Sequence, residues 1–240
     1  YACESGSRAW GFPSANSDYD VRFVYVRPKE WYLSIDVDIK RDVIEVPISD
    51  KLDISGWDLR KALGLLRKSN PPLLEWFSSP IIYLRDAEIT DKFLSLMPLC
   101  YSPTACIYHY LNMARNNFRE YLKGEVVSVK KYFYVMRPIL AIKWIETKGS
   151  IVPMEFGELV KELITDQELR REIDSLIVRK RCGDELKREP RIEPISLFIE
   201  NELKRLESTV IKKQDEKPQT ELLNVLFREI LEMPQIAKPT

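Results

Sequence analysis

The feature that most limits how this chain folds is a run of small and acidic residues near its beginning. Gly6-Ser7 is followed, after a polar loop, by Asp18-Tyr19-Asp20 at the start of an apolar segment that reaches Tyr25. Such a segment predicts a strand, and residues two apart in a strand point to the same face. The sequence therefore predicts two carboxylates, Asp18 and Asp20, side by side at the entry to one strand.

Two adjacent carboxylates repel each other unless a cation lies between them, and a divalent metal is the usual answer. Ahead of them, Gly6 and Ser7 offer backbone N–H groups and a hydroxyl at a turn, an arrangement that suits a phosphate. The alternative is a plain hairpin in which an aspartate caps a turn. The spacing and the apolar flanks favour a site in which Asp18 and Asp20 hold Mg²⁺ or Mn²⁺ for phosphoryl or nucleotidyl transfer.

Gly-Ser, a short spacer and Asp-x-Asp between apolar residues resemble the signature of the DNA polymerase β-like nucleotidyltransferase superfamily. Residues 5–11, 17–20, 56–61, 70–76 and 130–134 are similar to one branch, the predicted nucleotidyltransferases associated with RNA repair. The likeness runs through most of the chain. It implies transfer of a nucleoside monophosphate from a Mg-NTP to an acceptor hydroxyl, with RNA as a candidate acceptor and pyrophosphate as the other product.

A third carboxylate is expected, because in the superfamily such a residue activates the attacking hydroxyl. Asp53 lies between two apolar residues in the second arm of a predicted hairpin, and we prefer it as the third catalytic residue beside Asp18 and Asp20. A solvent-facing aspartate on an edge strand is the plainer interpretation. Glu75 stays open as a rival, since several relatives place this acid after a helix.

Two cations are candidate nucleotide contacts. The fork of Arg8 suits either a triphosphate or a structural ion pair, and the sequence does not decide between them. Lys130 and Lys131 lie near the beginning of a helix predicted over 129–147, where the helix dipole disfavours positive charge unless an anion is near. The resemblance implies a lysine from the helical part on the triphosphate, and of the two it points to Lys131.

The pattern of elements predicts an α+β protein. Strand-like segments and helices alternate up to about residue 97, and helical periodicity dominates afterwards. We expect a small mixed β-sheet nucleotidyltransferase domain over 1–97, an α-helical domain over 98–240, and the active site in the cleft between them.

Composition narrows the classes of function. Acidic and basic residues balance at 37 each. The chain therefore lacks the overall positive charge that is typical of bulk nucleic-acid binding. No apolar run suits a membrane span, and four cysteines without a C-x-x-C pair suggest neither zinc nor disulfides, which fits a cytoplasmic protein. His109, the one histidine, is expected to be packed rather than catalytic. The rival class is a non-catalytic nucleotide- or RNA-binding regulator, against which the presence of both Asp18 and Asp20 argues.

Overall fold

The first half of the chain builds a five-stranded mixed sheet. The structure is a computed structural model that describes residues 1–183, 187–208 and 219–233. The strand order is β3-β4-β2-β1-β5, in which β2 and β4 are parallel and the other neighbours antiparallel. The strands are β1 (Ala2–Glu4), β2 (Tyr19–Tyr25), β3 (Val43–Ser49), β4 (Leu52–Asp58) and β5 (Ile82–Leu84).

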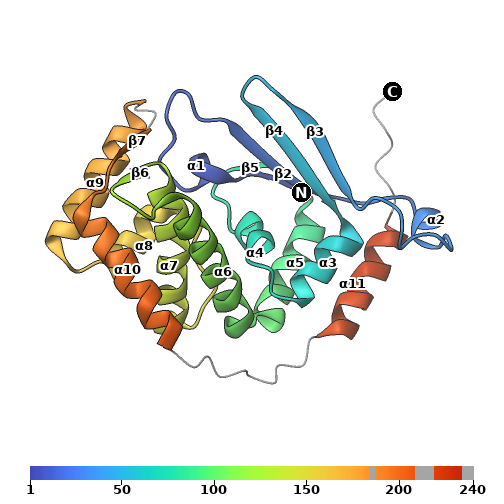
Figure 1. The fold of residues 1–240 in the computed structure, drawn as a ribbon. Coiled ribbons are helices and arrows are strands. Elements are labelled where there is room, and N and C mark those ends of the chain that lie inside the picture. The colour runs from blue at the N-terminus through green and yellow to red at the C-terminus, as the bar shows by residue number, and fades with distance from the viewer. Residues whose placement is uncertain (184–186, 209–218, 234–240) are drawn as a thin grey trace.

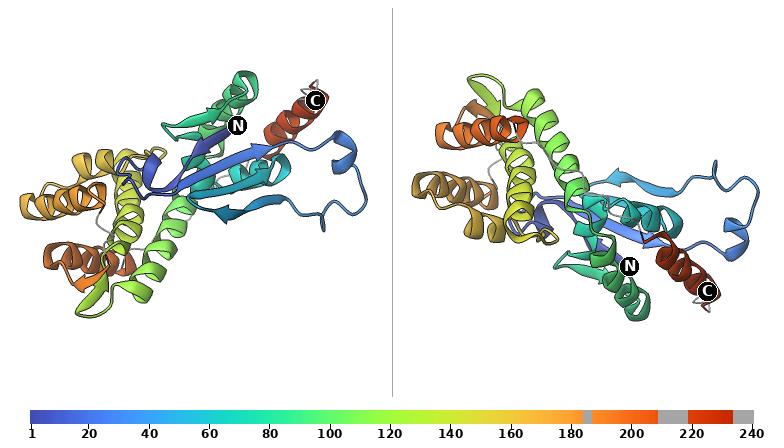
Figure 2. Two further views of the ribbon diagram at one scale, coloured as in Figure 1. Left: turned by 90° about the horizontal axis from the view of Figure 1, so that it is seen from above. Right: turned by 90° about the horizontal axis from the view of Figure 1, so that it is seen from below.

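Helices cover one face of this sheet and lie below it in Figure 1. The helices of this half are α1 (Gly6–Ala9), α2 (Lys29–Tyr32), α3 (Leu59–Arg67), α4 (Pro71–Phe77) and α5 (Ala87–Cys100). Trp57 of β4 stacks on Trp76 of α4 with ring centroids 3.7 Å apart, which fixes the helix layer against the sheet. The segment over 26–42, which contains α2, extends beyond the ends of the strands (Figure 2), and α2 contacts α11 (Thr220–Glu232) through the rings of Tyr32 and Phe227, whose centroids are 5.0 Å apart.

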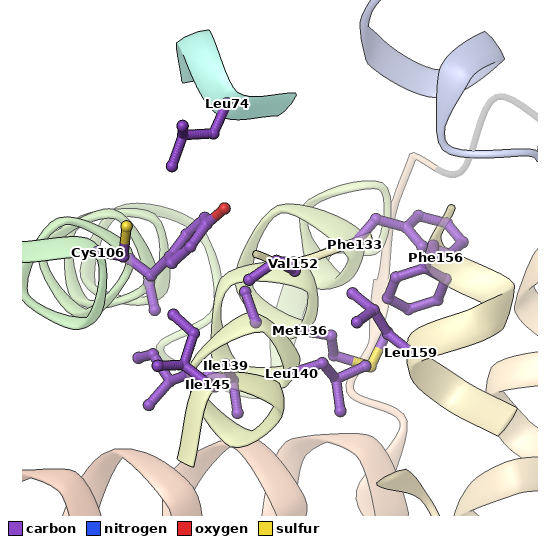
Figure 3. Packing of buried hydrophobic residues seen from close by; sticks show 14 of the residues in the cluster. Leu74, Cys106, Phe133, Met136, Ile139, Leu140, Ile145, Val152, Phe156 and Leu159 are labelled. Carbon is purple, nitrogen blue, oxygen red and sulfur yellow. The ribbon is translucent and has the colours of Figure 1, made fainter. Parts of the chain in front are cut away.

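The rest of the chain is mainly helical and is built around α7. The remaining elements are α6 (Pro103–Tyr121), β6 (Val126–Ser128), α7 (Lys131–Lys148), α8 (Phe156–Leu163), α9 (Gln167–Arg181), β7 (Arg188–Pro190), α10 (Glu193–Ser208) and α11 (Thr220–Glu232). Helix α7 is apolar on nearly every side, and a helix of that kind is buried. Its residues Phe133, Met136 and Leu140 are at most 1% exposed and pack against neighbouring helices (Figure 3).

The mixed sheet followed by helices confirms the predicted α+β class. The domain boundary at residue 97 stays a prediction. It falls inside α5, and α11 lies beside α3 in the first half (Figure 1), where Glu229 of α11 pairs with Lys92 of α5 at 2.9 Å. In the described part of the chain, no helix is both long and apolar enough to span a membrane.

One local prediction differs from the structure. The helix expected over 129–147 runs from Lys131 to Lys148, and residues 126–128 just before it pair with residues 188–190 as a two-stranded antiparallel sheet. Three-residue strands are too short to show a periodicity of two, so no pattern in the sequence indicates them. As a result, Lys130 is the N-cap residue and Lys131 the first residue of α7.

Candidate active site

A glycine places the backbone against one carboxylate. The chain leaves β1 at Glu4, and the Ser5 N–H donates to the Asp20 carbonyl at 2.9 Å as the chain turns into α1. Gly6 has a φ of +58°, and a Cβ there would lie 2.0 Å from Asp20 Oδ2. Only glycine fits this left-handed conformation and this close approach. The predicted Gly-Ser turn and the predicted carboxylate are therefore in direct contact.

Asp20 and Asp53 lie directly opposite each other on the parallel strands β2 and β4. Arg22, two residues along β2 on the same face, joins them. Its Nη2 donates to Asp20 Oδ1 at 3.1 Å and to Asp53 Oδ2 at 2.8 Å, while Nη1 donates to the Asp53 carbonyl at 3.0 Å. Sequence reasoning missed Arg22, although the period-two pattern of β2 places it beside Asp20.

Negative charge exceeds positive charge at this point. Burial raises the pKa of the Asp20 carboxyl above its ordinary value, Arg22 opposes this, and the charges of Asp53, Glu4 and Asp18 raise it further. Three other carboxylates and a single guanidinium therefore act on the Asp20 carboxyl. An additional cation would relieve the repulsion that remains.

The oxygen donors of this site suit a Mg²⁺ or Mn²⁺ ion that binds together with a substrate. No group of three or more His, Cys, Asp or Glu side chains in the described ranges is arranged to hold a metal ion alone. Magnesium usually takes one or two carboxylates and completes its shell with water and substrate phosphates. Asp20 and the exposed Asp18, one residue before β2, would supply the hard oxygen ligands that such an ion requires, and their role as ligands stays a prediction.

Arg8 and the serines order the loop between α1 and β2. The Ser7 hydroxyl donates to Ser17 Oγ at 3.2 Å, and Ser17 Oγ also accepts the Ser14 N–H at 2.9 Å. Arg8 donates to the carbonyls of Asp18 and Ser17 at 3.0 and 2.9 Å. The contacts of Arg8 in the structure are to carbonyl oxygens rather than to a carboxylate, and its predicted contact with the triphosphate stays a prediction.

Lys131 lies in the first turn of α7. Its Nζ is 4.2 Å from the centroid of the Tyr121 ring and 4.7 Å from that of Tyr134. Burial raises the pKa of Tyr134, and the charges of Asp20 and Asp18 raise it further, so this turn lies within electrostatic range of the two carboxylates. The nucleotide contact predicted for Lys131 stays a prediction.

Lys180 of α9 is a cation near the site that sequence reasoning missed. Its Nζ donates to Ser14 Oγ at 3.5 Å. Burial lowers the pKa of Lys180, repulsion from Lys130 lowers it further, and attraction to Asp18 opposes both. Lys180 therefore lies within electrostatic range of both Lys130 and Asp18. No local pattern indicates this, because the sequence of α9 is typical of a solvated charged helix.

The two rivals for the third carboxylate occupy different places. Asp53 lies with Asp20, whereas Glu75 of α4 is half-buried and its Oε1 accepts from Arg137 Nη1 at 2.6 Å and from the Tyr110 hydroxyl at 2.7 Å. The structure thus brings Asp53 to the carboxylate site and gives Glu75 another set of partners. The catalytic role of Asp53 stays a prediction.

Glu4 supports the site from behind. It is fully buried, its Oε1 accepts the Asp20 backbone N–H at 2.8 Å, and its Oε2 accepts from the Tyr83 hydroxyl. A hydrogen bond to a buried charged group is stronger than one between neutral groups. Glu4 therefore fixes the backbone at Asp20 and has no exposed surface beside the carboxylates.

Comparison with known proteins gives the family of the chain. The family model described as "RNA repair pathway DNA polymerase beta family" (RlaP) matches residues 1–229. The uncharacterised protein YcgL of Bacillus subtilis (strain 168) is 53% identical over 233 residues, which cover 97% of this chain and 89% of that protein.

Proposed function

The chain belongs to the RNA repair pathway DNA polymerase β family, and on that premise we propose that it transfers a nucleoside monophosphate from a Mg-NTP to an acceptor hydroxyl. One observation carries this proposal. Asp20 and Asp53 lie opposite each other and share a single arginine, with the exposed Asp18 close by and the Gly6 backbone against Asp20. A site with surplus negative charge beside a glycine turn suits a metal–triphosphate complex.

Asp18 and Asp20 would hold Mg²⁺ or Mn²⁺. When bound, such an ion offsets the charge of the triphosphate and makes the α-phosphorus easier to attack. Asp53 takes the proton of the acceptor hydroxyl as its oxygen forms a bond to the α-phosphorus. The bond from that phosphorus to the leaving oxygen breaks, and pyrophosphate departs. Arg22 holds Asp53 and Asp20 in the orientation that this step needs.

The outgoing phosphates would lie between the glycine turn and the helical wall. Ser7 supplies a hydroxyl beside the Gly6 backbone, and Lys131, Lys130 and Lys180 supply positive charge from the opposite side. Lysine acts on phosphate as a point charge, so these contacts tolerate the movement of a departing pyrophosphate. Arg8 serves the site by holding the loop that carries Asp18.

Nucleotide binding and turnover of single variants test this function. Asp18→Asn and Asp20→Asn should abolish Mg²⁺-dependent NTP binding in calorimetry and remove turnover with labelled NTPs and RNA acceptors. Asp53→Asn should lower turnover by at least about 100-fold while Mg-NTP affinity changes little, because it acts on the acceptor. Asp174→Asn, an exposed aspartate of α9, is the matched control and should resemble the parent.

Mg-NTP binding by both Asp18→Asn and Asp20→Asn at parental strength would overturn the proposal. Binding of RNA or nucleotide that is indifferent to Mg²⁺, without turnover on RNA, protein or small-molecule acceptors, would favour a non-catalytic regulator on the same fold.

A further inference from the structure

A groove of about 880 Å³ separates α6 from α10, away from the carboxylate site. Arg115, Arg119 and Phe118 of α6 line one wall, which Lys123 extends two residues beyond the end of that helix, and Lys204 is the cation of the α10 wall. The volume is at the upper end of the range for ligand sites. The groove thus combines several cations, one aromatic ring and enough space for part of a polymer.

The acids of the groove are partly engaged by arginines. Glu200 pairs with Arg191, which lies outside the groove, at 3.2 Å, and Glu207 lies 3.9 Å from Arg115. Within residues 1–183, 187–208 and 219–233, the structure pairs neither Lys123 nor Lys204 with an acid, and both are exposed. The groove therefore offers positive charge that no neighbouring carboxylate neutralises.

Three cations on the α6 side of the groove form a row. Arg115 and Arg119 are four residues apart, so they lie on one face of α6 about 6 Å apart along its axis, and Lys123 lines the same groove just beyond the end of the helix at Tyr121. That interval is close to the separation of successive phosphates along a nucleic-acid strand. Phe118 beside the row offers a flat apolar surface on which a base can stack.

The row leads toward the carboxylate site. Lys123 follows Tyr121 by two residues, and the ammonium of Lys131 lies over the Tyr121 ring. Tyr134, in the same turn of α7 as Lys131, is within electrostatic range of Asp18 and Asp20. We propose that the α6–α10 groove binds the phosphate backbone of a single-stranded RNA whose end reaches the carboxylate site of Asp18, Asp20 and Asp53. The choice of RNA rests on the proposed function and on the family match, whereas the groove itself calls for a polyanion.

Direct binding of a labelled oligouridylate to the full chain tests the groove without any turnover. The double variant R119Q/K123Q should bind it at least about tenfold more weakly than the parent at low salt. For a single strand, each phosphate that the variant leaves unneutralised should reduce the slope of log K against log salt by about 0.7, hence about 1.4 for two. The double variant K161Q/R171Q removes two exposed cations of α8 and α9 and should bind like the parent.

The outcomes separate this inference from the proposed function. R119Q/K123Q should retain parental Mg-NTP affinity, and D20N should retain parental RNA affinity. RNA binding that is absent from the parent, or equal in R119Q/K123Q and K161Q/R171Q, would overturn the groove while leaving the carboxylate site intact. Displacement of the RNA by polyglutamate at the same charge concentration would also overturn it, since the groove would then suit an acidic protein segment.

Discussion

Two arginine–carboxylate groups lie in different surroundings within this molecule. The open group consists of Arg22 with Asp20 and Asp53 on the neighbouring strands β2 and β4. The three side chains are 18%, 27% and 32% exposed. The closed pair consists of Arg137 and Glu75, which are 3% and 14% exposed. The chemistry of the charged groups is nearly the same, so their surroundings must set what each can do.

The closed pair is a structural link. Glu75 on α4 also accepts from Tyr110, and Arg137 on α7 lies 5.0 Å from the Trp10 ring and donates to the Met154 carbonyl at 3.4 Å. It joins an element of the first half to the centre of the helical half and supports Trp10, which follows α1. The open group has one arginine for two acids and access to solvent, so another cation can enter. The same ion-pair chemistry serves cohesion where it is buried and leaves room for a ligand where it is not.

Removing one partner of the closed pair should produce the largest effect. Arg137→Met leaves the Glu75 carboxylate buried without its countercharge, and we expect a loss of about 3–5 kcal/mol in the free energy of unfolding. Chemical denaturation measures it. Combining it with Glu75→Leu should recover part of the loss, because both charges are then absent.

The control for this prediction is Arg228→Met, which breaks the exposed pair with Glu221 on α11. It should leave the unfolding midpoint nearly unchanged, because exposed pairs are screened by water. If the free energy of unfolding of Arg137→Met equals that of Arg228→Met, the pair of Arg137 and Glu75 does not link the two halves.

A second prediction concerns the shape of the open group. Gly6→Ala forces a left-handed residue to carry a Cβ that collides with the Asp20 carboxylate, so we expect a loss of about 1–3 kcal/mol and weaker Mg-NTP binding. Gly64→Ala is the matched control. It lies in α3 with no atom within 4 Å of the added Cβ, and alanine there should stabilise by about 0.5–1 kcal/mol. A Gly6→Ala variant that gains stability like Gly64→Ala would show that the glycine turn is not constrained by Asp20.

The contrast between the two groups also shows what the sequence could reveal. The Gly6 turn and the Asp18–Asp20 pair were recognisable because their spacing is local and strands have a period of two. Whether Asp53 or Glu75 lies beside Asp20 depends on β2 and β4 pairing in parallel, and strand pairing is a tertiary property. The same alternation puts Arg22 on the face of Asp20, so its place beside that carboxylate was also predictable from local pattern.

Residues far along the chain were beyond such reasoning. Lys180 reaches Ser14 only because α9 packs near the loop before β2, and nothing in the charged pattern of α9 indicates which of its cations turns inward. The α+β class followed from elements long enough to show their periodicity. The pairing of β6 with β7 did not, because three residues carry too little pattern to distinguish a strand from a turn.

The smallest predicted effect probes the surroundings of the closed pair through His109, the one histidine of the chain. Burial lowers the pKa of His109 below its ordinary value, and the negative charge of Glu75 opposes this only in part. A histidine whose pKa is lower in the folded state adds stability above its unfolded pKa of about 6.5 that is lost as pH falls. The free energy of unfolding should therefore decline slightly more steeply below this pH in the parent than in His109→Gln.

Because there is a single imidazole, its NMR titration gives the pKa without ambiguity. A pKa at or above 6.5 would mean that Glu75 outweighs burial, and the closed pair would then be less shielded from its neighbours than its exposure indicates.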